Sequence, residues 1–416
     1  MRDIVESNNL VNILIGCERK YELSKGNKNF TQVNFIKQGH YEICSQGTLS
    51  RIEKGFSVNY LDILHHLIQK LGYSFTENNA DYYAIEQLVA HYLNTLQKRD
   101  LKSIDFIEAQ REVTFYLKKF ESVFYLSQIL TVLNFSIKYY LENELPNIDS
   151  LERLINCSTS FSNNIIVILF DLVVWVQEIS PYRSRLINEF LNYELTDVNE
   201  LVLLLNTIIS VRNGDFIKAI RNLDIIKIKN NNDLFLFRIK RLELLIEVNI
   251  TRIEKNSNFN SYYTFKDNSL ITIFEKAKFS HLLGIAEFYR SNFPQSLICF
   301  KEAADFYPPI TVLSMAFVVE ILKHSSPEKI ENYLEENYKY LNEYSDYYKH
   351  QYQFFQLLYC SKDLNSAANY MIKYLKPDLA RIKNKNIPYI FYENQMLEIV
   401  NRSKSYKLLY QLLKGE

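Results

Sequence analysis

Glycine and proline are scarce in this chain of 416 residues, which contains 9 glycines and 8 prolines. Together they account for about 4 per cent of the sequence, against a usual share of roughly 12 per cent. Folds with many tight turns, or with glycine loops around a phosphate group, need more of both. Six of the nine glycines lie within the first 72 residues. We therefore expect two segments of different construction, of which the long second one consists of helices joined by short connections.

Composition and charge exclude several classes of protein. Hydrophobic residues make up 47% of the chain, which is enough for a folded core. The net charge of zero argues against a protein that coats nucleic acid along its whole length. The 5 cysteines are scattered without a C-x-x-C pair, which is typical of reduced thiols and not of a disulfide framework or a zinc site.

Two features of the sequence bear on localisation. Residues 1–6 include acidic and polar residues where a signal peptide has an unbroken apolar run. The most apolar stretch, 165–176, is interrupted by Asp171 and is shorter than the roughly 20 residues of a membrane span. We expect this stretch to form a buried helix, and the protein to be cytoplasmic with no membrane contact.

The first 72 residues carry start and stop signals for short helices. Apolar spacing and turn residues predict helices over 11–23, 32–37, 46–54 and 60–71. Thr31 and Ser45 stand at N-cap positions, and Gly55 stands where a left-handed residue commonly ends a helix. Residues 19–54 carry a net charge of +4, as a surface that contacts phosphates requires, although ordinary scatter of charge is the alternative. Short helices in this number and size are typical of a small DNA-binding bundle.

Two stretches resemble the helix-turn-helix of the Cro/repressor-like (XRE) family. The first is Phe30-Thr31-Gln32, where the family begins the first helix of its motif. The second matches the recognition helix and runs Cys44-Ser45-Gln46-Gly47-Thr48-Leu49-Ser50-Arg51-Ile52-Glu53-Lys54-Gly55. The spacing from Gln32 to Ser50 is a few residues longer than in the family. We place the extra residues at 38–41, where they lengthen the turn or the first helix.

The resemblance implies a role in DNA binding for particular residues. Polar groups at the two helix starts would meet phosphates, and the exposed face of the second helix would reach base edges in the major groove. The implied DNA-binding residues are Gln32, Ser45, Gln46, Thr48, Ser50, Arg51 and Lys54. Leu49 and Ile52 would form the buried side of this helix. Glu53 is expected to pair with Lys54 or Arg51, or to cap a neighbouring helix.

A spaced pattern in the second segment is similar to a tetratricopeptide repeat. Counted from Gly284, the residues Ser296, Phe300, Ala303 and Pro308 fall at +12, +16, +19 and +24. In such repeats small residues let two antiparallel helices touch, aromatic residues fill the gap between units, and a proline ends the second helix. The pattern therefore predicts close contact at Gly284 and Ser296.

Weaker copies of this unit lie at 214–226 and 363–377. Such repeats stack into a right-handed superhelix whose first helices line a concave groove, and a mixture of aromatic, amide and cationic groups there suits an extended peptide. Gln356 could hold the peptide main chain, and Arg212 could meet a carboxylate. The candidate peptide-binding residues are Arg212, His281, Phe288, Tyr289, Tyr352, Gln356 and Tyr359. The alternatives are a non-repetitive array of helices and, for each of these residues, packing between repeats.

The sequence holds no recognisable pattern for catalysis, metal binding or cofactor binding. No two glycines have the spacing of a phosphate-binding loop or of a dinucleotide fold, and neither H-E-x-x-H nor G-x-S-x-G occurs. His65-His66 is the only close histidine pair, and adjacent residues on a helix point in different directions. We therefore expect no enzyme activity, no catalytic residue, no cofactor and no metal.

The order of the modules resembles the peptide-responsive (RRNPP) regulators of Gram-positive bacteria and their phages and plasmids, in particular PlcR- and Rgg-like proteins. The resemblance implies an all-α, homodimeric transcription regulator. Its helix-turn-helix domain would span 1–73, and its tetratricopeptide-like domain for peptide binding and dimerisation would span 80–416. Two copies would bind a double-stranded DNA operator, and a short signalling peptide would control that binding, as in quorum sensing.

Two alternatives remain open at the level of sequence. One is a constitutive helix-turn-helix regulator whose repeats bind a protein partner. The other is an interaction protein of the same superfamily that does not bind DNA.

Overall fold

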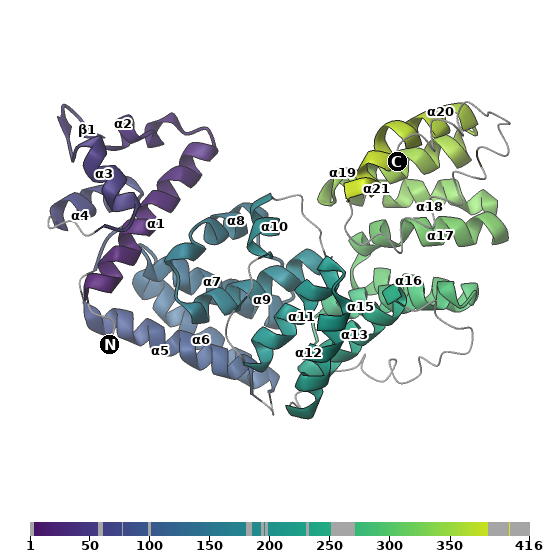
Figure 1. The fold of residues 1–416 in the computed structure, drawn as a ribbon, viewed down its shortest axis with the longest axis horizontal. Coiled ribbons are helices and arrows are strands. Elements are labelled where there is room, and N and C mark those ends of the chain that lie inside the picture. Colours follow the sequence, from purple (N-terminus) through teal and green to yellow (C-terminus); the bar gives the residue numbers. More distant parts are fainter. Residues whose placement is uncertain are drawn as a thin grey trace. The chain divides into compact units, whose positions relative to one another are not determined.

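The computed structural model describes residues 4–56, 61–76, 78–98, 101–179, 185–192, 195, 199–229, 233–250, 271–381 and 399. Within these ranges the chain is almost entirely helical, which confirms the predicted all-α class (Figure 1). The strands of these ranges are the two-residue β1 (Lys37–Gln38) and β2 (Tyr41–Glu42). Among the described helices, none combines the length and the apolar character needed to cross a lipid bilayer.

The chain forms two compact units. The first contains residues 1–173 and 184–195, and the second contains residues 174–183 and 196–416. The first unit therefore holds the predicted helix-turn-helix segment together with the helices that follow it, so this division differs from the expected boundary between residues 73 and 80. Residues 382–398 and 400–416 of the predicted repeat domain lie outside the described residues.

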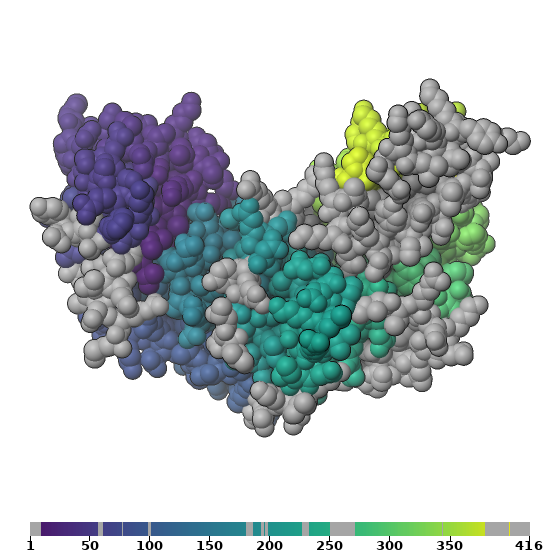
Figure 2. Space-filling model, in the orientation of Figure 1, coloured from purple at the N-terminus to yellow at the C-terminus, as the bar shows by residue number. Residues whose placement is uncertain are grey.

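The first unit begins with a bundle, called here the N-terminal bundle, that spans residues 4–76. Its helical elements are α1 (Ile4–Ser24), η1 (Lys28–Phe30), α2 (Gln32–Phe35), α3 (Gln46–Glu53) and α4 (Leu61–Lys70). Thr31 and Ser45 cap α2 and α3 as predicted, and Gly55 adopts a φ of 81° just after α3. In Figure 2 the purple atoms of this bundle lie directly against the blue atoms of the helices that follow it.

The turn between α2 and α3 is a short antiparallel hairpin. β1 pairs with β2 in the register Lys37 to Glu42 and Gln38 to Tyr41, and Gly39 between them has a φ of 63°. The helix expected over 32–37 therefore ends at Phe35, because the chain leaves it to form the hairpin. Of the two expected places for the extra residues 38–41, the structure has the lengthened turn.

Longer helices complete the first unit. They are α5 (Asn79–Leu96), α6 (Ser103–Phe120), α7 (Leu126–Leu141), α8 (Ile148–Asn156), η2 (Ser158–Ser160), α9 (Asn163–Ile179), whose last residues belong to the second unit, and α10 (Arg185–Phe190). The apolar stretch 165–176 lies within α9 and is almost wholly buried, which confirms that prediction. Asp171 within it is 0% exposed and accepts a hydrogen bond from the Tyr140 hydroxyl. A buried partner of this kind is what a carboxylate inside an apolar helix requires.

The second unit is a series of helices. They are α11 (Glu200–Asn213), α12 (Phe216–Lys229), α13 (Asp233–Ile250), α15 (Ile273–Tyr289), α16 (Phe293–Phe306), η3 (Pro308–Ile310), α17 (Thr311–Ser325), η4 (Pro327–Lys329), α18 (Ile330–Asn337), η5 (Tyr338–Glu343), α19 (Asp346–Phe355), η6 (Gln356–Cys360), α20 (Leu364–Tyr370), η7 (Met371–Leu375) and α21 (Lys376–Arg381). Gly214 joins α11 to α12 with a φ of 78°, which favours glycine because a Cβ is strained there.

Helices α15 and α16 make a close contact at Gly284. A Cβ added at Gly284 would lie 2.6 Å from the ring of Phe300, so only glycine fits this position without movement. The hydroxyl of Ser296 donates a hydrogen bond to the carbonyl oxygen of Gly284 at 2.7 Å. Helix α16 ends at Phe306, two residues before Pro308. The predicted contact of Gly284 with Ser296 and the predicted end of this helix are therefore confirmed.

Candidate nucleic-acid and ligand-binding sites

Helix α3 separates its residues into a buried side and an exposed side. Leu49 and Ile52 are both 0% exposed and hold the helix in the core of the bundle, as predicted. The Ser45 side chain accepts a hydrogen bond from the main-chain N–H of Thr48 at 3.1 Å and so caps the helix. Of the other predicted DNA-binding residues of this region, Ser45, Gln46, Arg51 and Lys54 are exposed, and Thr48 and Ser50 are partly exposed.

Helix α3 is anchored to α1 and α2 through Glu53. Arg19 of α1 forms an ion pair with Glu53, and its guanidinium also donates a hydrogen bond to the carbonyl oxygen of Phe30 at 2.6 Å. Gln32 donates from Nε2 to Glu53 Oε2 at 3.1 Å. Gly16 makes this approach possible, because a Cβ there would lie 2.9 Å from Glu53 Cβ. Glu53 thus fixes the position of α3 within the bundle.

These contacts correct one expectation. Glu53 pairs with Arg19 across the bundle and not with its neighbours Lys54 or Arg51, because Arg19 reaches the buried side of α3. Gln32 directs its side-chain amide to Glu53. This bond uses one of the two N–H groups of the Gln32 amide, and the role of Gln32 in DNA binding stays a prediction.

The positive charge of the bundle is distributed differently from a simple count over the sequence. Arg19 is 3% exposed, so its charge is not at the surface. Its charge is balanced by that of Glu53, and the net charge of +4 over 19–54 therefore remains with the other charged residues. Exposed cationic side chains of the bundle are Lys20, Lys25, Lys28, Lys37, Arg51 and Lys54. Of these, Arg51 lies on α3 and Lys54 directly follows it, whereas Lys25 forms an ion pair with Asp149 at 2.9 Å.

The candidate peptide-binding residues fall into separate groups in the second unit. His281 is 4% exposed, with Nδ1 2.8 Å from the Ser314 hydroxyl and its ring beside Phe300. Burial, and then the charge of Lys278, lower the pKa of His281 well below its usual range. Because His281 packs between α15, α16 and α17, its expected position on a groove wall is wrong.

Phe288 and Tyr289, at the end of α15, form an aromatic cluster. Their rings lie 5.2 and 6.4 Å from the ring of Phe317, measured between centroids. Both side chains are partly exposed, and burial raises the pKa of Tyr289 to about 12. Much of the surface of both side chains is therefore used in packing against neighbouring aromatic rings, which is the alternative to ligand contact.

The three candidates near α19 differ in exposure. Tyr352 is 6% exposed and belongs to the hydrophobic core, with its ring 5.4 Å from that of Tyr338, so its expected groove position is also wrong. Gln356 and Tyr359 are partly exposed and lie in η6, which is a turn of π-helix that directly continues α19. Turns of π-helix occur frequently at functional sites.

Arg212 belongs to a cationic cluster that sequence reasoning missed. Glu178, near the end of α9, raises the pKa values of both Arg212 on α11 and Lys278 on α15, while burial has the larger effect and lowers both. Glu178 Oε2 also lies 3.8 Å from Arg241 on α13. We call these four residues the Glu178 cluster. The charge of Glu178 acts on both Arg212 and Lys278, which are partly exposed, and an added anion would offset the cost of burying their charge.

Trp175 connects this cluster to a buried ion pair. The guanidinium carbons of Arg238 and Arg241 lie over its ring, 4.0 and 4.4 Å from the centroid. Arg238 donates from Nε to Glu275 at 2.8 Å, and both side chains are almost wholly buried. The signal in the sequence was a pair of arginines three positions apart within an apolar helix, where charges occur mainly when they are paired or functional.

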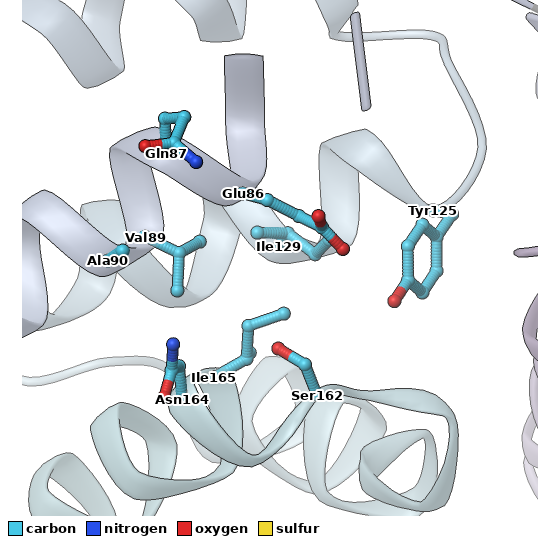
Figure 3. A pocket seen from close by; sticks show the side chains of 9 residues that line it. All are labelled: Glu86, Gln87, Val89, Ala90, Tyr125, Ile129, Ser162, Asn164 and Ile165. Carbon is cyan, nitrogen blue, oxygen red and sulfur yellow. The ribbon is translucent and has the colours of Figure 1, made fainter. Parts of the chain in front are cut away.

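A cavity of about 350 Å³ lies in the first unit between α5, α7 and the start of α9 (Figure 3). Its wall carries one carboxylate, two amides and two hydroxyl groups, which together suit a small polar molecule. The residues that line it are Glu86, Gln87, Val89, Ala90, Tyr125, Ile129, Ser162, Asn164 and Ile165. None of the predicted peptide-binding residues is among them.

Comparison of the chain with protein-family models, with curated proteins and with solved structures finds no significant match. The chemistry of the described residues is therefore the basis for a functional proposal.

Proposed function

We propose that this protein is a DNA-binding transcription regulator in which α2 and α3 form a helix-turn-helix and α3 is the recognition helix. The observation that carries the proposal is the division of α3. Its apolar residues Leu49 and Ile52 are 0% exposed, whereas Gln46 and Arg51 are exposed and Thr48 and Ser50 are partly exposed. An exposed Arg51 can bind guanine and an exposed Gln46 can bind adenine through paired hydrogen bonds.

The remaining contacts of such a complex follow from the helix starts. The first main-chain N–H groups of α2 and α3 have no partner within their own helices and suit phosphate oxygens. Lys54, just beyond the end of α3, would add a phosphate contact without sequence preference. In this arrangement Arg51 determines specificity, and Lys54 contributes to affinity.

Selection from random-sequence DNA duplexes with the full chain supplies the probe for a test. Fluorescence anisotropy then gives the Kd of the selected duplex at several salt concentrations. Arg51→Ala should weaken binding of that duplex by about 1–3 kcal/mol, and Lys54→Ala should weaken all duplexes alike and lower the salt slope by about 1. Arg111→Ala removes an exposed arginine from α6 and is the matched control.

Two outcomes count against the proposal. An unchanged Kd for Arg51→Ala would contradict the role of α3 while leaving DNA binding by another surface open. A selection that enriches no sequence above the starting library would contradict sequence-specific DNA binding altogether.

We further propose that the second unit is a right-handed, tetratricopeptide-like superhelix that binds a short peptide. The contact of Gly284 with α16 and the left-handed Gly214 between α11 and α12 support hairpins of the kind that such repeats stack. The Glu178 cluster supports an acidic ligand, because burial lowers the pKa values of Arg212 and Lys278 and an added carboxylate would offset that cost. A peptide that ends in a free carboxylate, or carries an acidic side chain, fits this chemistry.

Trp175 provides a direct assay for such a ligand, because it is the single tryptophan of the chain and lies against Arg241. Synthetic peptides with free C-terminal carboxylates are titrated while its fluorescence is recorded, and the amidated forms serve as ligand controls. Lys278→Met should weaken a peptide that binds by about 1.5–3 kcal/mol, the range for a hydrogen bond to a charged group. Lys301→Met on the exposed side of α16 should not. If the amidated peptide binds as tightly as the free acid, and Lys278→Met binds the free acid as tightly as the unsubstituted chain does, the peptide binds elsewhere.

The proposal includes a homodimer, in which two bundles bind the two halves of a pseudo-palindromic operator. Peptide and operator would then change each other's affinity by the same factor. Sedimentation of the complex with the selected duplex gives the number of chains per operator, and one chain per duplex would contradict the dimer.

A further inference from the structure

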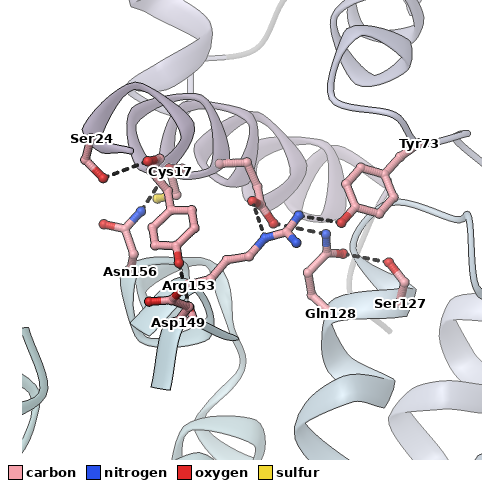
Figure 4. Close-up of polar contacts among 10 residues, drawn as sticks. Cys17, Ser24, Tyr73, Ser127, Gln128, Asp149, Arg153 and Asn156 are labelled. Carbon is pink, nitrogen blue, oxygen red and sulfur yellow. Dashed lines mark hydrogen bonds and ion pairs between the residues drawn. The ribbon is translucent and has the colours of Figure 1, made fainter. Parts of the chain in front are cut away.

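The N-terminal bundle is held against α8 by polar contacts between α1 and the helices α7 and α8 (Figure 4). Glu18 on α1 is 0% exposed and accepts hydrogen bonds from Arg153 Nε at 2.7 Å and from Gln128 Nε2 at 3.2 Å. Tyr21 donates its hydroxyl hydrogen to the carbonyl oxygen of Asp149 at 2.6 Å. These contacts, called here the α1–α8 seam, hold the facing side chains of the two helices in place.

Two cysteines meet across the α1–α8 seam. Asn156 donates from Nδ2 to the carbonyl oxygen of Cys17 at 2.8 Å, and Cys17 Sγ lies 4.0 Å from the hydroxyl of Thr159. Cys157 lies between those two residues in the sequence, and its thiol is close enough to the Cys17 thiol for each to shift the pKa of the other. The two thiols are therefore neighbours, although more than a hundred residues separate them along the chain.

The two thiols have different environments. Cys17 is partly exposed, and the neighbouring Cys157 thiol, with help from Thr159 and the charge of Lys20, lowers its pKa. Cys157 is 0% exposed, and the neighbouring Cys17 thiol together with burial raises its pKa well above the usual range. Thiolate character and access therefore favour Cys17 as the sulfur that reacts first.

We propose that Cys17 and Cys157 are a redox-sensitive pair that forms a disulfide when the protein meets a hydroperoxide, and that this disulfide joins the N-terminal bundle covalently to α8. In the first step the sulfur of Cys17 attacks one peroxide oxygen and the O–O bond breaks. Cys17 becomes a sulfenic acid, and the other oxygen leaves as water or as an alcohol. In the second step the sulfur of Cys157 attacks the sulfur of Cys17, the S–S bond forms, and the hydroxyl group leaves with the Cys157 proton as water. One hydroperoxide is reduced by two electrons, and two thiols are oxidised.

The disulfide changes how the bundle is attached to the rest of the first unit. In the reduced protein the α1–α8 seam holds the bundle by non-covalent contacts, and in the oxidised protein the bundle cannot leave α8. This inference concerns the thiols alone and does not depend on DNA binding. A dithiol reductant reverses it by thiol–disulfide exchange.

Mass spectrometry of the full chain tests the proposal directly. The protein is treated with hydrogen peroxide and digested without reduction. We expect a linked pair of peptides containing Cys17 and Cys157, and we expect dithiothreitol to separate them. Cys44 in the same bundle is the internal control, because burial raises the pKa of its thiol. Iodoacetamide should alkylate Cys44 about tenfold more slowly than Cys17 in the reduced protein.

Two variants make the test specific. Cys157→Ser removes the second sulfur, so peroxide should leave Cys17 as a sulfenic acid that dimedone traps, with no linked peptides. Cys299→Ser is the matched control for loss of a buried thiol and should form the linked pair like the unsubstituted chain. The proposal is overturned if peroxide consumes thiols of the unsubstituted protein without linking Cys17 to Cys157. It is also overturned if dimedone labels Cys17 equally in the unsubstituted chain and in Cys157→Ser.

Discussion

Substitution of Gly284 by alanine tests the close contact between α15 and α16. The new Cβ would lie 2.6 Å from two ring atoms of Phe300, and the ring is 4% exposed, with His281 and Phe317 beside it. Overpacking of this kind costs about 1–3 kcal/mol, whereas alanine gains about 1 kcal/mol over glycine inside a helix. We therefore expect Gly284→Ala to lower the free energy of unfolding of the second unit by up to about 2 kcal/mol.

Urea unfolding followed by Trp175 fluorescence measures this change, because the single tryptophan lies in the same unit as Gly284. A lower midpoint at an unchanged m-value is the expected result. In a Phe300→Leu background the ring is gone, and Gly284→Ala should become neutral or stabilising. Gly214→Ala is the control, since its strain arises from a φ of 78° with no atom within 4 Å, and Phe300→Leu should not relieve it.

Two results of this double-mutant cycle would contradict a steric clash between Cβ of residue 284 and the Phe300 ring. If Gly284→Ala destabilises the Phe300→Leu protein as much as the unsubstituted protein, the ring is not the cause. If Gly284→Ala alone stabilises the second unit, the helices move apart at little cost, and the close contact is not required.

Two further predictions concern the bundle and the pH dependence of stability. Gly16→Ala places a Cβ 2.9 Å from Glu53 Cβ and should destabilise the bundle by about 1–3 kcal/mol, seen as faster hydrogen exchange in α1 and α3, whereas Gly47→Ala meets no atom closer than 3.7 Å and should not. The lowered pKa of His281 means that, below pH of about 6.5, the unfolded chain binds a proton that the folded chain does not. The contribution of neutral, buried His281 to the free energy of unfolding of the second unit is therefore complete above that pH. It is lost as the pH falls, at up to about 1.4 kcal/mol per pH unit. His281→Gln should flatten the dependence of the urea midpoint on pH, and an unchanged slope would contradict the assignment.

The starts of α2 and α3 and the end of α3 could be predicted because their signals are local. Thr31, Ser45 and Gly55 act within one turn of the chain, through a cap or through a backbone angle that glycine adopts easily. The contact of Gly284 with Ser296 was predictable because their spacing resembles that of a tetratricopeptide repeat, in which small side chains let two antiparallel helices touch. Leu49 and Ile52 follow from helical periodicity alone.

Partners across the fold could not be predicted in the same way. Glu53 has two cationic neighbours in sequence, Arg51 and Lys54, yet it pairs with Arg19, because the side of α3 that carries Glu53 faces α1. His281 and Tyr352 lie on helices that were expected to line a groove, but neighbouring helices cover both side chains. Helical spacing tells which residues share a face, and it does not tell which neighbour covers that face.

The sequence by itself determined the helical class, the capped segments around α3 and the contact at Gly284, because each depends on side-chain size, capping chemistry or backbone freedom over a short distance. Only the tertiary structure decided that the charge of Glu178 acts on Arg212 and Lys278, and that Cys17 contacts Asn156 and Thr159 on either side of Cys157. Those pairs join helices far apart along the chain. Their interactions depend on distance and burial, which arise only when the helices pack.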